Sequence, residues 1–179
     1  LIGIYKMALL LENKNTFSIN DIKSKSEMEQ FTFYLSQEYA NLCKKLLFIS
    51  QQLDLNEEIQ IEDNISCNLL YYASLLNSNY LVKKLLEKGY DPLYINKKCN
   101  NETAVHIAAR NGRTDILTLL LYDLPKTQLI KAVQMQNIYF DSPLRLAMQE
   151  PRAEIILCDL IVPDEIIKLE EERYDRLKS

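Results

Sequence analysis

The chain has 179 residues, of which 47% are hydrophobic and 26% are charged, and its formal net charge is -4. This balance is typical of a folded domain with its own core, and a net negative charge argues against nucleic-acid binding, which needs a concentrated basic surface. Only 3 glycines are present, which disfavours β-sandwiches, barrels and glycine-rich phosphate loops and favours helices.

The cysteines and the single histidine limit the chemistry further. No two of the four cysteines have a CxxC spacing, so we expect free thiols in a reducing, cytoplasmic compartment: Cys43, Cys67, Cys99 and Cys158. A structural zinc site would need a closer cluster of ligands, and the chain contains no phosphate-loop, dinucleotide or hydrolase motif. We therefore expect no metal, no cofactor and no catalytic residue.

The first residues of the chain are predicted to be helical, with a loop over 13–25. The apolar run 7–11 is too short to span a bilayer and lacks the flanks of a signal peptide, so we expect no membrane insertion. Because Leu1 is not an initiator methionine, we expect the chain to be a segment of a longer protein.

A longer helix is predicted from about 27 to about 53. Ser26 and Glu29 have the spacing of a capping box, and one apolar stripe runs along the helix at helical intervals, formed by Phe31, Leu35, Leu42, Leu46 and Ile49. We interpret residues 1–64 as a helical N-terminal cap on the downstream residues, with a separate functional unit as the alternative.

The middle of the chain contains one well-formed motif. Residues 101–112 read NETAVHIAARNG, and residues 115–121 read DILTLLL. Two short helices, over about 104–111 and 114–122, cannot bury their own apolar sides, so such a unit is stable only when copies stack on one another. Small Ala108 and Ala109 allow close approach, and Gly112 suits the reversal between the helices.

This motif resembles the ankyrin repeat, in which T-P-L-H-x-A-A-x-x-G is followed by a leucine-rich helix. A copy upstream has Leu70 and Ala73 in the first helix, Asn77 at the usual glycine and Gly89 in its closing turn. A copy downstream is Ser142-Pro143-Leu144-Arg145-Leu146-Ala147. The threonine-equivalent positions are 68, 103 and 142, so the steps are 35 and 39 residues, against about 33 for the family.

The extra residues fall at connections, where insertions cost little. They lengthen the loop 93–100 and replace a turn at 124–133 with what is predicted to be extra helix. Beyond the repeats, Pro163 can open a helix, which we predict to be a C-terminal cap. The resemblance thus implies an all-α ankyrin-repeat solenoid, with a cap over 1–64, repeats over 65–161 and a capping helix over 162–179.

His106 is the only histidine, and its position in the motif implies a structural role. In ankyrin repeats this histidine hydrogen-bonds to threonine and backbone groups. The acidic run 170–172 is interpreted as a solvated helix face, because adjacent helical residues point in different directions. Neither feature predicts catalysis.

The resemblance implies a module that binds another protein through hairpin tips and the exposed side of each first helix. Carried onto this chain, it gives the candidate contact residues Lys98, Asn100, Glu102, Arg110, Asn111, Tyr139, Phe140, Asp141, Gln149 and Glu150. Aromatic residues at a tip are candidate hot spots. For Tyr139 and Phe140 the alternative is packing against the inserted segment 125–135.

A second functional hypothesis is a regulatory or substrate-recruiting domain of a larger enzyme whose catalytic part lies outside this chain. The irregular repeats, rich in Ile, Asn and Lys, also resemble ankyrin proteins that intracellular bacteria deliver into host cells, which would place the chain in the host cytosol.

Overall fold

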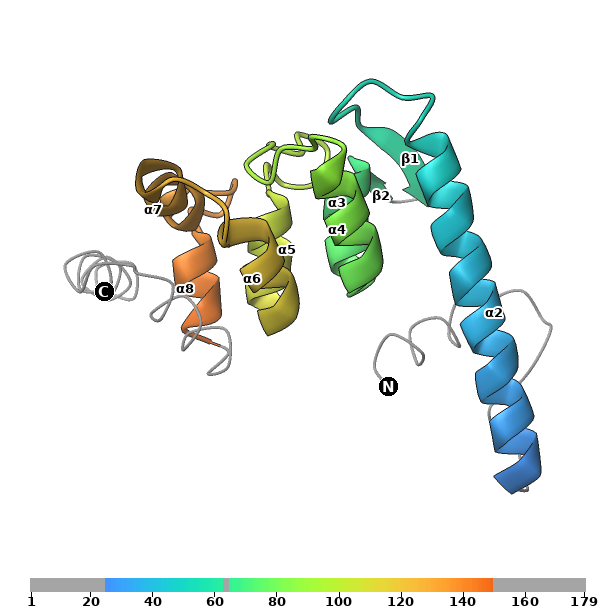
Figure 1. Ribbon diagram of the computed structural model, residues 1–179. Coiled ribbons are helices and arrows are strands. Elements are labelled where there is room, and N and C mark those ends of the chain that lie inside the picture. Colours follow the sequence, from blue (N-terminus) through green and yellow to red (C-terminus); the bar gives the residue numbers. More distant parts are fainter. Residues whose placement is uncertain (1–24, 63–64, 150–179) are drawn as a thin grey trace. The chain divides into compact units, whose positions relative to one another are not determined.

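The computed structural model describes residues 25–62 and 65–149, and the chain divides into two compact units, with the sequence boundary between Gln52 and Leu53. The described part is mostly helical (Figure 1). The predictions for residues 1–24 and 150–179, including the helix at Pro163 and the acidic run 170–172, lie outside the described residues.

The first unit contains the long helix α2, Lys25–Ile49. It begins one residue before the predicted cap at Ser26 and ends before the predicted limit near residue 53. Cys43 and Leu46 are buried, whereas Phe48 is 60% exposed. None of the described helices is both long and apolar enough to cross a membrane.

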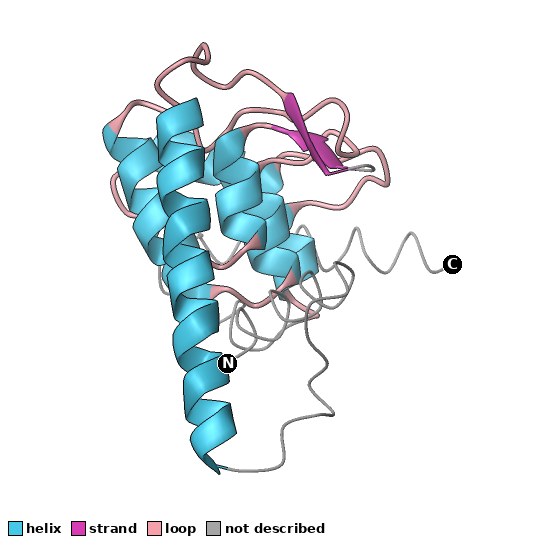
Figure 2. Cartoon of the chain, turned by 90° about the vertical axis from the view of Figure 1, so that its right-hand side faces the viewer, coloured by secondary structure: helices cyan, strands magenta, loops and turns pink. Residues whose placement is uncertain are grey.

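The second unit opens with a two-stranded antiparallel hairpin, β1 (Ile59–Glu62) and β2 (Ile65–Cys67), drawn in magenta in Figure 2. The expectation that residues 1–64 are helical is therefore wrong at their C-terminal end. Ile59 and Ile61 alternate with Gln60 and Glu62, a period of two that suits a strand rather than a helix.

Within the described residues six helices come after the hairpin, and four of them form the two helix pairs predicted around Leu70 and His106. The first helices of the repeats are α3 (Leu69–Leu75), α5 (Ala104–Arg110) and α8 (Pro143–Ala147), and the second helices are α4 (Asn79–Glu87) and α6 (Thr114–Leu121). The insertion predicted at 124–133 forms a complete helix, α7 (Lys126–Gln134).

The three threonine-equivalent positions all cap a first helix. Asn68 Oδ1 accepts the Tyr71 amide at 2.8 Å, Thr103 Oγ1 accepts the His106 amide at 3.4 Å, and Ser142 Oγ accepts the Arg145 amide at 3.1 Å. Each cap satisfies an amide that the first turn of a helix cannot pair internally. The predicted register of 68, 103 and 142 is confirmed by these bonds.

The first helices lie in series, since α5 contacts both α3 and α8, and α4 contacts α6 in the same way (Figure 1). Ala108 and Ala109 are buried, as their small size predicted, and so is Ala73 in the first helix of the upstream repeat. Leu120 is buried in the second-helix layer, whereas Leu119 is only half-buried. The stacking places the connections between repeats side by side at one end of the helices.

Candidate functional site

Two hairpin connections project beside one another, and we name them the first finger (93–102) and the second finger (135–141). In the first finger the Asn96 amide donates to the Glu102 carbonyl at 2.9 Å, and the Cys99 amide donates to the Asn96 carbonyl at 3.0 Å. The Asn96 side chain accepts the Asn68 amide at 2.7 Å and donates to the Glu102 carbonyl at 2.9 Å. Asn96 therefore ties the finger to the cap of α3.

The second finger repeats this design around Asn137. The Asn137 amide donates to the Asp141 carbonyl at 3.0 Å, and Asn137 Oδ1 accepts the amides of Tyr139 at 2.9 Å and Asp141 at 3.0 Å. The Ile138 amide donates to the Asn100 carbonyl at 3.0 Å. This last bond joins the two fingers directly, so their tips form one continuous ridge.

Glu102 is buried in the structure, whereas the sequence analysis placed it at an exposed tip. Its side chain is fully buried, so the prediction that it contacts a partner at an exposed tip is wrong. Its carboxylate accepts from Tyr71 Oη at 3.1 Å and Asn137 Nδ2 at 3.0 Å. It also forms a two-point ion pair with the Arg110 guanidinium, in which Nη1 donates to Oε2 at 2.9 Å. A buried carboxylate is tolerated when it is hydrogen-bonded in this way.

The Glu102 carboxylate thus joins three repeats, because Tyr71 belongs to α3, Arg110 to α5 and Asn137 to the second finger. Burial, followed by the charge of Glu102, raises the pKa of the Tyr71 hydroxyl well above its usual value. Tyr71 therefore remains protonated and donates to the carboxylate. The sequence offered one signal for this network, a tyrosine at the position usual for histidine.

His106 has the structural role that the resemblance implied. Its Nδ1 lies 2.8 Å from Thr103 Oγ1 and accepts the Thr103 amide at 3.1 Å, so side chain and backbone cap one another. Burial lowers the pKa of His106 to about 4, although Glu102 and the carbonyls of Met135 and Asp141 act in the opposite direction. The neutral ring can accept the Thr103 amide at Nδ1, which stabilises the start of α5.

The remaining predicted contact residues fall into three groups. Lys98, Asn100, Tyr139, Phe140 and Gln149 are exposed. Arg110, Asn111 and Asp141 are half-buried and have internal partners: Asn111 donates to the Ile107 carbonyl at 2.8 Å, and Asp141 pairs with Arg145 at 2.9 Å. Glu150 lies outside the described residues.

The ridge also carries apolar side chains that the sequence analysis missed. Ile95 in the first finger is 41% exposed and Ile138 in the second is 50% exposed. Tyr139 and Phe140 are 59% and 61% exposed, which favours a surface role over the alternative in which they pack against 125–135. Apolar residues beside turn-forming asparagines were the available signal for Ile95 and Ile138.

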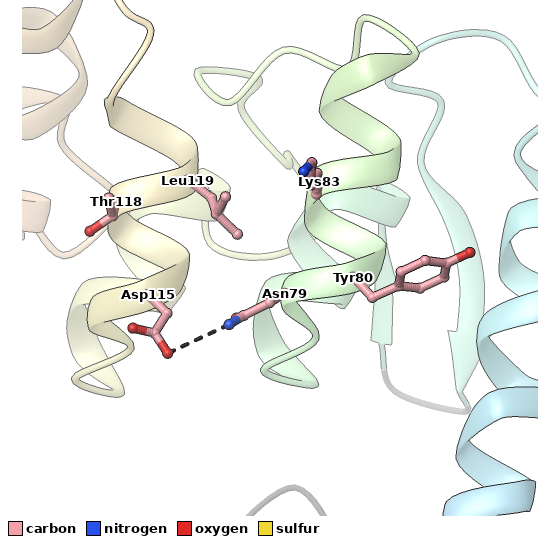
Figure 3. Close-up of a pocket in the computed structure, with 6 residues that line it drawn as sticks. All are labelled: Asn79, Tyr80, Lys83, Asp115, Thr118 and Leu119. Carbon is pink, nitrogen blue, oxygen red and sulfur yellow. Dashed lines mark hydrogen bonds between the residues drawn. The ribbon is translucent and has the colours of Figure 1, made fainter.

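A second surface feature lies on the second helices, between α4 and α6. This shallow pocket is lined by Asn79, Tyr80, Lys83, Asp115, Thr118 and Leu119. Figure 3 shows Asn79 facing Asp115, to which it donates at 3.5 Å, while the Tyr80 ring points away from α6. Its lining mixes opposite charges and brings no catalytic pair together.

The described residues contain no cluster of three His, Cys, Asp or Glu side chains that could hold a metal ion. Cys43, Cys67 and Cys99 form no disulfide with one another. Cys99 Sγ donates to the Ser66 carbonyl at 3.2 Å, and burial raises the pKa of its thiol, which disfavours a reactive thiolate.

The comparison with known families agrees with the repeats described above. The family model for ankyrin repeats, which holds three copies, matches residues 33–132. The chain belongs to the ankyrin-repeat family. The match covers much of α2, where the sequence analysis found no repeat, and it ends before α8. No curated protein matches the chain.

Proposed function

We propose that this chain is a protein-binding module whose partner contacts the two fingers and the exposed side of the first helices. Ankyrin repeats are generally protein–protein interaction modules, and the family membership therefore supports the class. The conformation and exposure of Phe140 support the choice of surface.

Phe140 has a positive φ of 62° and is 61% exposed. The other described non-glycine residues with positive φ are all asparagines: Asn56, Asn77, Asn100 and Asn101. Asparagine tolerates the left-handed region, whereas a bulky residue there costs roughly 1–2 kcal/mol. An exposed aromatic ring in a strained position contributes little to folding, and such strain is a motive for a functional hypothesis.

The proposed contact surface combines the ridge with the wall behind it. The ridge supplies Lys98, Asn100, Tyr139 and Phe140 as exposed groups. We retain Gln149, which is exposed just after α8, and Glu150 as further candidate contacts. We call the exposed side of α5 and α8 the wall; it carries Arg110, Asn111 and Arg145, and Arg145 pairs with Asp141 of the second finger. Each of these side chains is already held by a partner within the chain. Aromatic anchors commonly carry most of the energy of such an interface. We therefore propose that Tyr139 and Phe140 contribute the largest share of the binding free energy.

The test is a pull-down to identify a partner, followed by affinity measurements on variants. Replacing Tyr139 and Phe140 together with alanine should weaken binding by at least about 2 kcal/mol while leaving the melting temperature unchanged. Tyr122→Ala is the matched control, because this tyrosine lies just after α6 and is 74% exposed. Equal losses in both variants would show that the fingers are not the contact surface.

Arg110 is unsuitable for this test, although the sequence made it attractive. Its guanidinium neutralises the buried Glu102, so Arg110→Ala would leave a buried carboxylate without its cation. Lost binding in that variant would not separate a missing contact from a disturbed fold.

A second reading of the same surface is recruitment for a larger enzyme whose chemistry lies outside this chain. Ankyrin-repeat domains are typically non-catalytic, and we propose that the isolated chain has no turnover of its own. The full-length sequence separates the two readings, since a neighbouring catalytic domain would favour recruitment. Delivery by bacteria into a host cell rests on composition alone.

We further propose that residues 1–64 and 162–179 cap the ends of the repeats. An array must shield its last apolar faces from water. Deleting either segment should then promote aggregation in light scattering. Monomeric truncations with unaltered melting would contradict the capping proposal.

A further inference from the structure

The chemistry of the partner can be narrowed by asking which charges of the candidate surface are still available. The arginines of the wall are not available to a partner, because each is already paired within the chain. Arg110 is paired with Glu102 across two hydrogen bonds, and Arg145 pairs with Asp141 at 2.9 Å. An ion pair of this kind presents little net charge to a partner.

Lys97 and Lys98 at the tip of the first finger differ from the wall cations. Both are exposed, and among the described residues no carboxylate lies within ion-pairing distance of either ammonium group. Their backbone amides, by contrast, are engaged and donate to the Glu58 carboxylate at 2.7 and 3.2 Å.

The nearby carboxylates are occupied by other donors. Glu58 also accepts from Tyr94 Oη at 3.3 Å, and Asp91 accepts the Leu93 amide at 2.8 Å at the base of the finger. Glu58 therefore fixes the backbone that carries the two lysines and leaves their side chains to solvent. Within the described part of the chain, the tip presents two unpaired cations, although the net charge of the whole chain is -4.

These cations lie on the same ridge as the exposed apolar side chains. The bond from the Ile138 amide to the Asn100 carbonyl sets the second finger directly against the first, two residues from Lys98. Ile95, Ile138, Tyr139 and Phe140 are apolar members of this ridge. On the described candidate surface, charge and apolar area thus occur together at the fingers and not along the wall.

We propose that the partner is a peptide segment that carries acidic residues next to an aromatic or branched apolar residue. The acidic side chains meet Lys97 and Lys98, and the apolar residue packs on Tyr139 and Phe140. This inference rests on the proposed function. Complementary charge at the tip favours such a segment over one that is basic or only apolar.

The experiment uses a library of short random peptides displayed on phage and selected against the full chain. We expect enriched peptides to combine Asp or Glu with Phe, Tyr, Trp, Leu or Ile. Binding of synthetic copies is then measured by fluorescence anisotropy at low and high salt. The double variant Lys97→Glu, Lys98→Glu should weaken binding by about tenfold or more at low salt and by less at high salt.

Lys83→Glu on α4 is the matched control and should change affinity less than about twofold, since it lies on the second-helix surface. Enriched peptides that are basic or uncharged, no enrichment at all, or equal effects of the Lys97/Lys98 and Lys83 variants would overturn the acidic class. The double variant Tyr139→Ala, Phe140→Ala separates the two proposals. If it loses peptide binding while the Lys97→Glu, Lys98→Glu variant does not, the proposed surface stands and only the acidic character of the partner is wrong.

Discussion

The two fingers share one backbone plan and differ in the residues placed on it. Each contains a buried asparagine, Asn96 or Asn137, that bonds across the finger. Each then places a left-handed residue, Asn101 or Phe140, and an acid, Glu102 or Asp141, directly before the helix cap.

The first finger uses these positions for the fold. Asn101 takes the left-handed conformation at low cost, and Glu102 is buried among Tyr71, Arg110 and Asn137. The second finger has a strained, exposed phenylalanine and a half-buried aspartate whose carboxylate pairs with nearby Arg145. Both equivalent positions thus serve the fold in the first finger, whereas in the second finger the left-handed position carries an exposed ring, which we propose contacts the partner.

The sharpest test of this contrast compares the two acids. Glu102→Ala should lower the free energy of unfolding by about 3–4 kcal/mol, because it leaves Tyr71 and Asn137 without a buried acceptor and Arg110 without its partner. Asp141→Ala should cost only about 1 kcal/mol or less, since that pair is partly open to water. Urea unfolding of both variants measures the difference.

Glu102→Gln is the informative intermediate, because it keeps the shape and one acceptor but loses the charge. We expect its free energy of unfolding to lie between that of the wild type and that of the alanine variant. If Glu102→Ala and Asp141→Ala were equally mild, the buried network would not hold the repeats together, and the contrast between the fingers would be lost.

The next prediction concerns the loss of stability at acidic pH. The pKa of His106 is lowered by burial to about 4 in the folded chain, against 6.5 when the ring is exposed. The unfolded chain therefore binds a proton first as pH falls, so stability contributed by the neutral ring is complete above pH 6.5 and is lost progressively toward pH 4. The total is up to about 3 kcal/mol.

Denaturant unfolding between about pH 7 and pH 4 measures this loss, with His106→Gln as the control. The variant should be less stable at neutral pH by about 1–3 kcal/mol and should show a shallower decline over this window. Parallel curves for both proteins would mean that carboxylates, and not His106, set the acid sensitivity.

How far the sequence predicted this structure depends on whether each feature is local. The repeat register at 68, 103 and 142 and the reversal at Gly112 depend on neighbouring residues, and the structure confirms them. The helix α7 was expected only as an extra turn, because its length depends on packing against α8.

Other features depend on contacts between distant residues. Glu102 looks like a surface residue in sequence, and only Tyr71 and Asn137, 31 and 35 residues away, make its burial favourable. The hairpin of β1 and β2 was missed because its strands are only four and three residues long and closely follow, in sequence, the helix predicted to about residue 53. Exposure of Tyr139 and Phe140 could not be chosen over packing, since both suit an apolar pair beside an insertion.

A smaller effect tests the backbone plan of the first finger. Asn101 has a φ of 58°. Asn101→Ala should therefore cost about 1 kcal/mol, because alanine does not tolerate this region, whereas Asn101→Gly should be close to neutral. Thermal or urea unfolding distinguishes the two. Equal costs for alanine and glycine would show that the asparagine side chain matters more than the conformation.

The smallest effect on stability is the one that bears most on function. Phe140→Asn places at the second finger the residue type that adopts the same conformation elsewhere in the described chain. Because the ring is 61% exposed, its loss removes little burial, and relief of strain should raise the free energy of unfolding by about 0.5–1 kcal/mol. The same change should weaken partner or peptide binding, since the proposed anchor is gone. Unfolding curves and affinities are measured on the same preparations, with Tyr122→Asn as the exposed aromatic control. A variant that is more stable and binds less well would mean that Phe140 is retained for contact at the expense of stability. A variant that is less stable and binds normally would mean that the ring belongs to the fold, and the second finger would then resemble the first.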